Sequence, residues 1–374
     1  MPRWSEFPVV LKKLVLAHWR NVNTLTLEPG GGVTVFVGRN AQGKTNVVEA
    51  VAYLSCGRSH RTSHDRELVM WNQETAYLRA ETEHRDGGHR VEMALNADGG
   101  KALRVGGLPA RRMGELMGHV NTVLFAPEDL AIVKSGPAAR RRFLDMDIAQ
   151  TDPAYFYDLQ QYQKALGQRN ALLKQLAFRP SHADTLDVWD EQLATCGARI
   201  AVRRRQYVAE LFEEAAAAHG ALSRGERLEA RLLSGVSADN TEEAAETLLR
   251  QLTEAREGDI RRTTTSVGPH RDDFTLLVNG YDLRLYGSQG QHRTAALALK
   301  LAELKVMSRR TGETPILILD DVLSELDGER RAGLIRAVAG VQTLLTCVKL
   351  EEEMTGLDLD IYDVAGGEVR RRAQ

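Results

Sequence analysis

Apolar side chains recur along the chain in two patterns, one typical of buried strands and one typical of helices. Residues 33–37 (VTVFV) and 314–321 (TPILILDD) contain short apolar runs, which favour buried strands. In residues 153–176 and 186–211 the apolar side chains recur mostly at spacings of three, four and seven, the repeat of an amphipathic helix. Residues 291–310 are rich in Ala and Leu and contain no Gly or Pro, so we expect a long helix there.

The two helices with the heptad-like repeat flank the segment AFRPSHAD, where Pro180 predicts that the first helix ends. We therefore expect a short antiparallel helical hairpin, although Arg203 breaks the repeat of its second helix. A further helix is expected at Glu242–Arg256. A second interpretation fits the same pattern: these helices complete the core of the domain and form no separate arm.

Three other regions have mixed patterns. Residues 80–106 alternate between apolar and polar positions and are bounded by Gly and Asn, which predicts hairpin strands. Residues 122–150 combine an apolar strand, an acidic turn and a run of three arginines, and residues 266–278 lead from a turn into a strand. The sequence contains no internal repeat and no low-complexity segment.

Composition limits the classes of protein that the chain can belong to. Its 374 residues are 43% hydrophobic and 27% charged, as expected for a soluble globular protein of about two domains. The formal net charge of −2 means that any contact with nucleic acid must come from local basic patches. No apolar stretch reaches 18 residues, so we expect no membrane partner. Cys56, Cys196 and Cys347 lie far apart, which favours free thiols in a cytoplasmic protein.

The strand at 33–37 runs into GRNAQGKTN and then into a helical segment, which is the full context of a phosphate-binding P-loop. Its glycines let backbone amides surround the phosphates of ATP, the ammonium of Lys44 bridges two of them, and the hydroxyl of Thr45 binds Mg²⁺. The residues expected to contact the nucleotide are Gly38, Arg39, Asn40, Ala41, Gln42, Gly43, Lys44, Thr45 and Asn46. A glycine-rich turn that binds nothing is the alternative.

The second strand, in 314–321, ends in two carboxylates, as the Walker B strand of a P-loop enzyme does. We assign Asp320 to hold Mg²⁺ through water and Asp321 to polarise the attacking water, with Lys44 as the third catalytic candidate. The alternative is a buried strand whose acidic end only caps the next turn. Most of the chain separates Lys44 from Asp320, so a large insertion must lie between two halves of one ATPase domain.

The long helix of residues 291–310 is preceded by YGSQGQHRT, which places Ser288 and Gly290 at its N-terminus. Free backbone amides and the positive end of the helix dipole favour an anion there. Taken alone, Ser288 fits the role of a simple helix cap equally well.

The order of these motifs resembles the ABC-type ATPases, in which SQGQ takes the place of the signature motif. In that family the signature binds the γ-phosphate held by the P-loop of the opposite subunit. The resemblance therefore implies that Ser288, Gly290 and Gln291 contact ATP on a second copy of this chain. Residues 324–327 (SELD) match the D-loop, which implies that Asp327 lies at the same interface.

Further segments narrow the resemblance to the RecF family of bacterial recombination-repair proteins, which are SMC-like ABC ATPases with a short arm. They are LVLAHWRNV, LSCGRSHRTSHDRELV, FAPEDL, RRRFLD, GPHRDD and SQGQHRTAALALKLAEL, and they extend from one end of the chain to the other. The resemblance implies ATP and Mg²⁺ as cofactors, an ATP-dependent homodimer and weak DNA-stimulated ATP hydrolysis. It also implies binding to duplex DNA at single-strand/double-strand junctions, and RecA loading together with RecR and RecO.

The chain departs from the wider ABC pattern at three places. Asp321 replaces the usual catalytic Glu, and its shorter side chain leaves the base further from its water, so slow turnover is expected. The segment QTLLTCVK contains no switch histidine, which leaves Thr346 as a candidate γ-phosphate sensor. FAPEDL occupies the Q-loop region without a glutamine, and either Glu128 or Asp129 could assist Mg²⁺.

Several basic clusters could contact DNA, and we favour the one that contains Arg58, Arg61 and Arg66. Residues 140–142 fit a nucleotide-linked or interface role equally well, and residues 203–205 fit a solvated, ion-paired helix face. No motif for base readout is present, so we expect binding selective for DNA structure rather than for sequence.

The fold class that we predict is α/β, a two-lobed ABC-type P-loop ATPase head with an inserted helical, coiled-coil-like arm. Residues 1–150 and 263–374 would form the head, and residues 151–262 the arm. The nucleotide-binding subunit of a membrane ABC transporter is the alternative, disfavoured by the missing switch histidine, the widely separated Walker motifs and Gln289 in the signature. A metabolite kinase is disfavoured because it needs neither signature nor D-loop.

Overall fold

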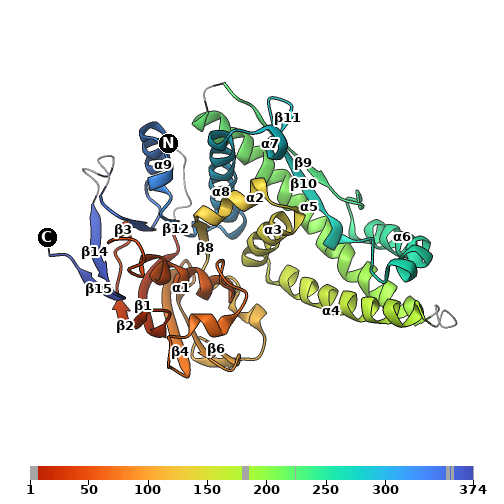
Figure 1. The fold of residues 1–374 in the computed structure, drawn as a ribbon, viewed down its shortest axis with the longest axis horizontal. Helices are drawn as coiled ribbons and strands as arrows, with labels where there is room; N and C mark the ends of the chain where they lie inside the picture. The colour runs from red at the N-terminus through yellow and green to blue at the C-terminus, as the bar shows by residue number, and fades with distance from the viewer. Residues whose placement is uncertain (1–6, 179–184, 224, 351–353, 355–357, 374) are drawn as a thin grey trace.

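The computed structural model describes residues 7–178, 185–223, 225–350, 354 and 358–373. Within these residues the chain forms two six-stranded sheets, a three-stranded sheet and helices that cover them (Figure 1). The Pro180 stop predicted between the two arm helices lies outside the described residues.

The first sheet holds the strands that carry the nucleotide motifs. Its order is β15-β14-β3-β13-β12-β8, and all neighbouring pairs are parallel except β14 with β15. The strands β12 and β13 are buried at every residue, as expected for a parallel sheet covered on both faces. The bounds are β3 (Val33–Val37), β8 (Thr122–Phe125), β12 (Ile316–Asp320), β13 (Thr343–Cys347), β14 (Leu359–Ala365) and β15 (Glu368–Arg371).

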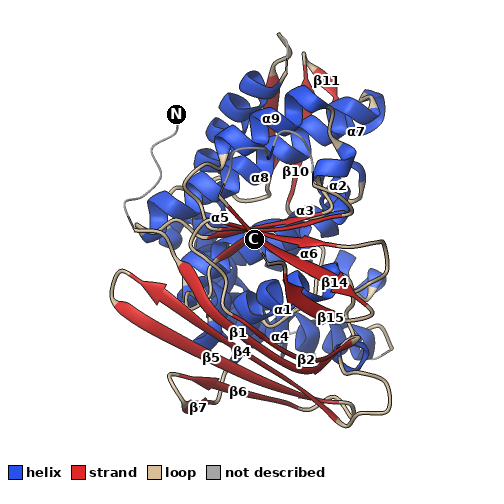
Figure 2. Cartoon of the chain, turned by 90° about the vertical axis from the view of Figure 1, so that its left-hand side faces the viewer, coloured by secondary structure: helices blue, strands red, loops and turns tan. Residues whose placement is uncertain are grey.

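The second sheet is antiparallel, in the order β2-β1-β4-β5-β6-β7, and curves beneath the first in Figure 2. The hairpin strands predicted in residues 80–106 belong to it. Its strands are β1 (Val10–Trp19), β2 (Val22–Leu27), β4 (Thr75–His84), β5 (Gly87–Asn96), β6 (Lys101–Val105) and β7 (Leu108–Ala110). Helix α1 (Lys44–Cys56) lies between the two sheets and contacts strands of both, which explains why it is buried almost all round.

Helix α8 (Gln289–Thr311) matches the long helix predicted from residues 291–310 and packs against α2, α3 and α5. A small sheet, β11-β10-β9, lies beside it. The remaining elements here are α2 (Leu130–Lys134), α3 (Pro137–Thr151), β9 (Leu228–Leu233), β10 (Asp273–Val278), β11 (Tyr281–Asp282), α7 (Leu283–Tyr286) and α9 (Gly328–Ala337).

The arm consists of α4 (Pro153–Leu176), the first half of α5 (Asp187–Leu222) and α6 (Thr241–Arg262), at the right of Figure 1. The predicted hairpin of α4 and α5 is present, and α6 packs on it. Helix α5 is longer than predicted and continues along α8, where Lys305 and Arg309 form ion pairs with Glu214. The first half of α5 therefore belongs to the predicted hairpin, whereas its second half packs on α8, as the alternative interpretation of a helix in the domain core expects. The domain limits of the arm stay a prediction, since β9 pairs with β10 across the expected limit at residue 262.

A buried charge cluster joins the three helices of the arm. The guanidinium of Arg169, which is 0% exposed, donates to Asp190 at 2.6 Å, to Asp259 at 2.8 Å and to Thr265 at 2.9 Å. These partners come from α5, from α6 and from the segment after α6. Because a buried charge without its partner is very unfavourable, the cluster fixes how the helices pack.

We expect Arg169→Ala to destabilise the protein by about 3–5 kcal/mol, because it leaves two buried carboxylates without their shared cation. Denaturant unfolding followed by circular dichroism measures this change. Arg199→Ala is the matched control, since Arg199 pairs with Asp158 but is 47% exposed, and it should cost no more than about 1 kcal/mol. Equal losses in the two variants would contradict the role assigned to the cluster.

Candidate functional site

The P-loop connects β3 to α1 and has the backbone shape that an anion site requires. Gly43 has φ +109°, and a Cβ there would lie 2.6 Å from the side chain of Asn21. A Cβ on Gly38 would lie 2.3 Å from the carbonyl oxygen of Val364. Both positions therefore need glycine. The ammonium of Lys44 donates to the carbonyl oxygens of Gly38 at 2.7 Å and Arg39 at 2.9 Å, so it lies over the loop where phosphates would bind.

Contacts from distant segments hold this loop in place, and the sequence patterns did not predict them. The side chain of Asn21, between β1 and β2, donates to the carbonyl oxygen of Gln42 and accepts from the side chain of Asn46. The amides of Gly366 and Gly367, in the turn between β14 and β15, donate to the side chain and to the carbonyl oxygen of Gln42. The sequence feature that pointed to these contacts is weak: Asn and Gly-Gly are residue types that favour turns between strands.

The Walker B carboxylate meets the P-loop across the parallel sheet. Asp320, at the end of β12, accepts hydrogen bonds from the hydroxyls of Thr45 at 2.9 Å and Thr346 at 2.7 Å. Burial raises the pKa of Asp320, and the two hydroxyl bonds partly offset that rise. The Thr45 hydroxyl lies 2.9 Å from the Asp320 carboxylate, so a Mg²⁺ bound by Thr45 would have Asp320 close enough to accept from a water on that ion, and the residues fit it.

Asp321 follows directly and adopts a left-handed conformation with φ +53°. Its amide donates to the hydroxyl of Thr346 at 2.9 Å. Its Oδ1 is buried and has no hydrogen-bond partner among the described residues. A carboxylate oxygen left free in a nucleotide site can accept from a water molecule. Thr346, by contrast, uses its hydroxyl within the Walker B region.

His60 lies in the chain between Arg58 and Arg61, and unlike them it has both ring nitrogens buried. Neither ring nitrogen has a hydrogen-bond partner among the described residues, and burial lowers the pKa of this histidine. It lines a cavity of about 410 Å³ together with Glu128 and Asp129 of the FAPEDL segment. His60 therefore faces the carboxylates near Walker B, which its place in the sequence did not reveal.

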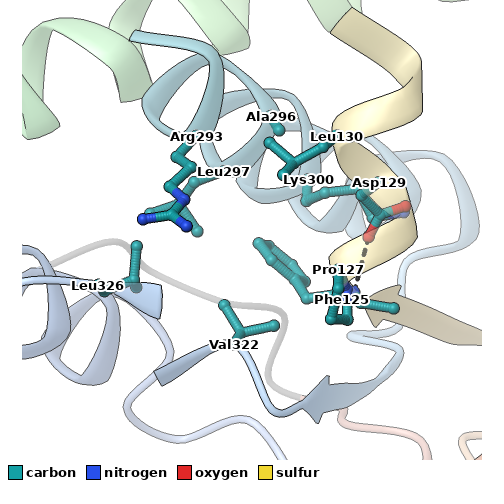
Figure 3. Close-up of a pocket in the computed structure, with 11 residues that line it drawn as sticks. Phe125, Pro127, Asp129, Leu130, Arg293, Ala296, Leu297, Lys300, Val322 and Leu326 are labelled. Atoms are coloured by element: carbon teal, nitrogen blue, oxygen red, sulfur yellow. Dashed lines mark hydrogen bonds between the residues drawn. The ribbon is translucent and has the colours of Figure 1, made fainter. Parts of the chain in front are cut away.

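The FAPEDL segment lies between the signature helix and the D-loop. Figure 3 shows a small cavity where Phe125 and Leu130 of this segment face Leu297 on α8 and Leu326 of the D-loop. The Oδ2 of Asp129 accepts from the amide of Ala126 at 2.8 Å, and burial raises the pKa of Asp129. Asp129 is thus engaged in its own turn.

The signature and the D-loop meet in a second place. Ser288 caps α8: its hydroxyl accepts from the amide of Gln291 at 3.2 Å, and its own amide donates to the side chain of Gln291 at 2.8 Å. Asp327 caps α9 and pairs with Arg330. Ser288, Gly290, Gln291 and Asp327 line one groove of about 410 Å³. No P-loop residue lines this groove. Among the described residues, no hydrogen bond links Ser288 or Gly290 to the P-loop.

The arginine clusters have different surroundings. Arg58, Arg61 and Arg66 are exposed, and Arg61 donates to Asn46 and Glu49 on α1, which places it close to the P-loop. Within the run 140–142, Arg140 is buried and pairs with Asp273. Within the run 203–205, Arg204 is buried against Asp145 and Asp272, and its two neighbours are ion-paired. Residues 203–205 are thus ion-paired, as that interpretation expects, but the solvated face is wrong for Arg204, which is buried.

None of the helices that the structure describes is both long enough and apolar enough to cross a membrane. Cys56 and Cys196 are free thiols, as predicted.

Comparison with known proteins covers almost the whole chain. Residues 10–358 match the family model described as RecF/RecN/SMC N terminal domain. The DNA replication and repair protein RecF of Lachnoclostridium phytofermentans is 42% identical over 366 residues, which are 97% of this chain and 100% of the relative. RecF of Geobacillus thermodenitrificans is 43% identical over 96% of this chain and 98% of its own length.

Solved structures agree with these relatives. The recombination mediator protein RecF of the RecFOR pathway, as RecF-ATPrS, has a TM-score of 0.91 at 39% identity and covers 99% of this chain and 100% of its own. RecF-ATP has a TM-score of 0.91 at 38% identity, with 100% and 99% coverage. The Smc head domain of Pyrococcus furiosus, at 16% identity and a TM-score of 0.56, shares the fold. The predicted α/β ABC-type head is therefore confirmed, and the chain belongs to the RecF family of DNA replication and repair proteins.

Proposed function

We propose that this chain is an ATP-gated DNA-binding protein of recombinational repair and replication restart. ATP joins two heads, the dimer holds duplex DNA near single-strand gaps, and weak, DNA-stimulated hydrolysis releases it. The observation that carries this proposal is the division of the ATP motifs. The P-loop and Walker B meet in one place, the signature and D-loop line another, and so a second copy must complete each ATP site.

On the P-loop side, Lys44 would exchange its two carbonyl partners for the phosphates of ATP. Thr45 would bind Mg²⁺ directly and Asp320 would hold it through water, and the ion supplies charge neutralisation of the phosphates when bound. Asp321, with its free Oδ1, would accept from the attacking water. Thr346 bonds both to Asp320 and to the amide of Asp321, so we assign it a positioning role rather than that of a γ-phosphate sensor.

We assign to Glu128 the role of the Q-loop glutamine, which is to assist Mg²⁺ binding. Asp129 is less suited to that role, because its carboxylate accepts from the amide of Ala126. His60 lies in the same cavity as Glu128. The other P-loop residues, Arg39 to Gln42 and Asn46, would contact the nucleotide through the loop backbone or its edge.

On the signature side, the Ser288 hydroxyl and the Gly290 amide lie at the N-terminus of a 23-residue helix. The helix dipole and the free amides favour the γ-phosphate presented by the partner. Gln291 supports Ser288 through the capping box and donates to Glu226 at 2.7 Å, which ties the signature to the segment between α5 and β9. Asp327 would face the same interface.

DNA contact would rest on local basic residues, since the net charge is −2. Arg58, Arg61 and Arg66 are exposed close to α1, and they are our candidates. We propose that the protein acts on DNA in the cytoplasm and assists RecA loading with RecO and RecR, because solved relatives belong to the RecFOR pathway. We further propose a head formed by residues 1–150 and 263–374 and an arm formed by residues 151–262. A transporter subunit is not favoured by these relatives.

Lys44→Met should reduce ATP hydrolysis by about a hundredfold or more, because it removes a charge that stabilises the transferred phosphoryl group. Steady-state phosphate release, with and without duplex DNA, measures this effect. Lys13→Met is the control, since Lys13 pairs with Glu28 on the surface of the other sheet, and it should leave the rate unchanged. Retention of the full rate in Lys44→Met would show that the P-loop assignment is wrong.

Ser288 variants separate a helix cap from a phosphate contact in the partner. Aspartate caps a helix as well as serine does, but its charge would repel a γ-phosphate. We expect wild type to dimerise only with Mg-ATP, and Ser288→Asp and Ser288→Arg to bind ATP yet to dimerise about a hundredfold more weakly or worse. Light-scattering mass with ATP, ADP or no nucleotide measures this.

A mixture of Lys44→Met and Ser288→Arg chains provides the control, because a mixed dimer contains one intact composite site. Partial recovery of the dimer in this mixture is the expected result. If Ser288→Asp dimerised as wild type does, Ser288 would be only a cap and the composite site would be abandoned.

The basic candidates predict how DNA affinity depends on salt. Replacing Arg58, Arg61 or Arg66 by Ala should weaken duplex binding and lower the slope of log K against log salt by about one unit for each lost phosphate contact. Arg250→Ala is the control, since Arg250 is 64% exposed on α6, in the arm. Fluorescence anisotropy at four salt concentrations gives the slopes, and an unchanged slope in all three variants would exclude this cluster.

A further inference from the structure

Three histidines meet on the antiparallel sheet, far along the chain from the ATP motifs. His84 ends β4, His89 lies on β5, and His119 precedes β8. The ring centroids of His84 and His89 are 4.2 Å apart, and those of His89 and His119 are 4.9 Å apart. His84, Asp86 and His89 place ligand atoms within 4.8 Å of one another. The chain has only ten histidines, so the cluster is a property of the fold and not of a histidine-rich sequence.

His84 supports the cluster through contacts of both its ring nitrogens. Its Nε2 lies 2.9 Å from the carbonyl oxygen of His119, and its Nδ1 lies 3.1 Å from the carboxylate of Glu313. Both ring nitrogens of His84 are thus engaged by neighbouring groups of the fold. The His84 ring stacks on the ring of His89 with an interplanar angle of 19° and fixes its plane.

His89 and His119 differ from His84, because their Nδ1 atoms face each other at 3.1 Å. The Nε2 of His89 lies 3.0 Å from the carboxylate of Asp86, which keeps hydrogen on Nε2 and leaves the lone pair on Nδ1. One of these two Nδ1 atoms donates to the other, and an ion placed between them would replace that hydrogen bond. With its hydrogen on Nε2, His119 would then present a second lone pair to the same ion.

This arrangement has the geometry of two ligands on one metal ion. Two nitrogens bound to a tetrahedral Zn²⁺ at about 2.0–2.1 Å lie about 3.3 Å apart. A carboxylate on the far nitrogen of a ligating histidine, as Asp86 is placed on His89, is the usual outer partner of such ligands. We propose that His89 and His119 bind a transition-metal ion, Zn²⁺ in particular, through their Nδ1 atoms, at a site separate from the ATP site.

The chemistry of the donors selects the class of ion. Imidazole suits zinc and its neighbours in the first transition row, whereas Mg²⁺ prefers oxygen ligands. Two protein ligands leave the other coordination positions to water, so the site is open and exchangeable. The ion would join β5 to the segment that leads into β8, and through β8 to the FAPEDL segment.

Isothermal titration of the full-length, chelator-treated, nucleotide-free protein with zinc chloride in magnesium-free buffer tests the proposal. We expect one Zn²⁺ per chain, lost in His89→Gln and in His119→Gln. Asp86→Asn should weaken binding by about tenfold or more, because it alters the outer partner. His64→Gln is the control, since His64 is exposed and lies outside the cluster, and it should bind zinc as wild type does.

Thermal unfolding provides a second measurement. Zinc at a hundred times its Kd should raise Tm by about 5 °C in wild type and in His64→Gln, but not in His89→Gln or His119→Gln. Circular dichroism and ATP binding verify that each variant is folded. Absence of zinc binding in wild type, or undiminished binding in both cluster variants, would overturn the site. Either result would leave the ATP-gated function untouched.

Discussion

Three strand ends converge on one buried carboxylate, that of Asp320, and the nucleotide site depends on this convergence. Thr45 lies at the start of α1, which the P-loop connects to β3. Thr346 lies near the end of β13, opposite Asp320 in the register of the sheet. The hydroxyls of Thr45 and Thr346 both donate to the same oxygen of Asp320. The bonds offset part of the cost of burying the carboxylate. Because β3 and β12 are held by the sheet and not by sequence proximity, the chain can place a whole helical arm between them without disturbing the site.

Much of this framework follows from sequence patterns. The strands β3 and β12 are almost entirely apolar. A strand that is buried on both faces shows such a run and no alternation of apolar and polar residues. Helix α4 matches its predicted range because its apolar side chains repeat along its full length. These predictions succeeded where the local pattern and the tertiary environment favour the same structure.

The rest depends on contacts that no local pattern records. Helix α5 continues past residue 211 through EEAAAAHGAL, which has few large apolar side chains; the packing against α8 and the ion pairs of Glu214 explain its length. Arg140 and Arg204 occur in charge runs that suggest a surface, yet each is buried by aspartates distant in the chain. Asn21 and Gly367 contact the P-loop from opposite ends of the sequence, so only the folded sheet reveals them.

Helix α5 also has a mechanical consequence. A 36-residue α-helix is about 54 Å long, and this one has its first half in the arm and its second half against α8, which begins beside Ser288. The buried contacts of Arg169 fix the first half, and the ion pairs of Glu214 fix the second. If α5 turned with α8 as a rigid body, a rotation of about 10° would displace the far end of α5 by about 9 Å. A small movement of the signature helix would in this way become a large movement of the arm.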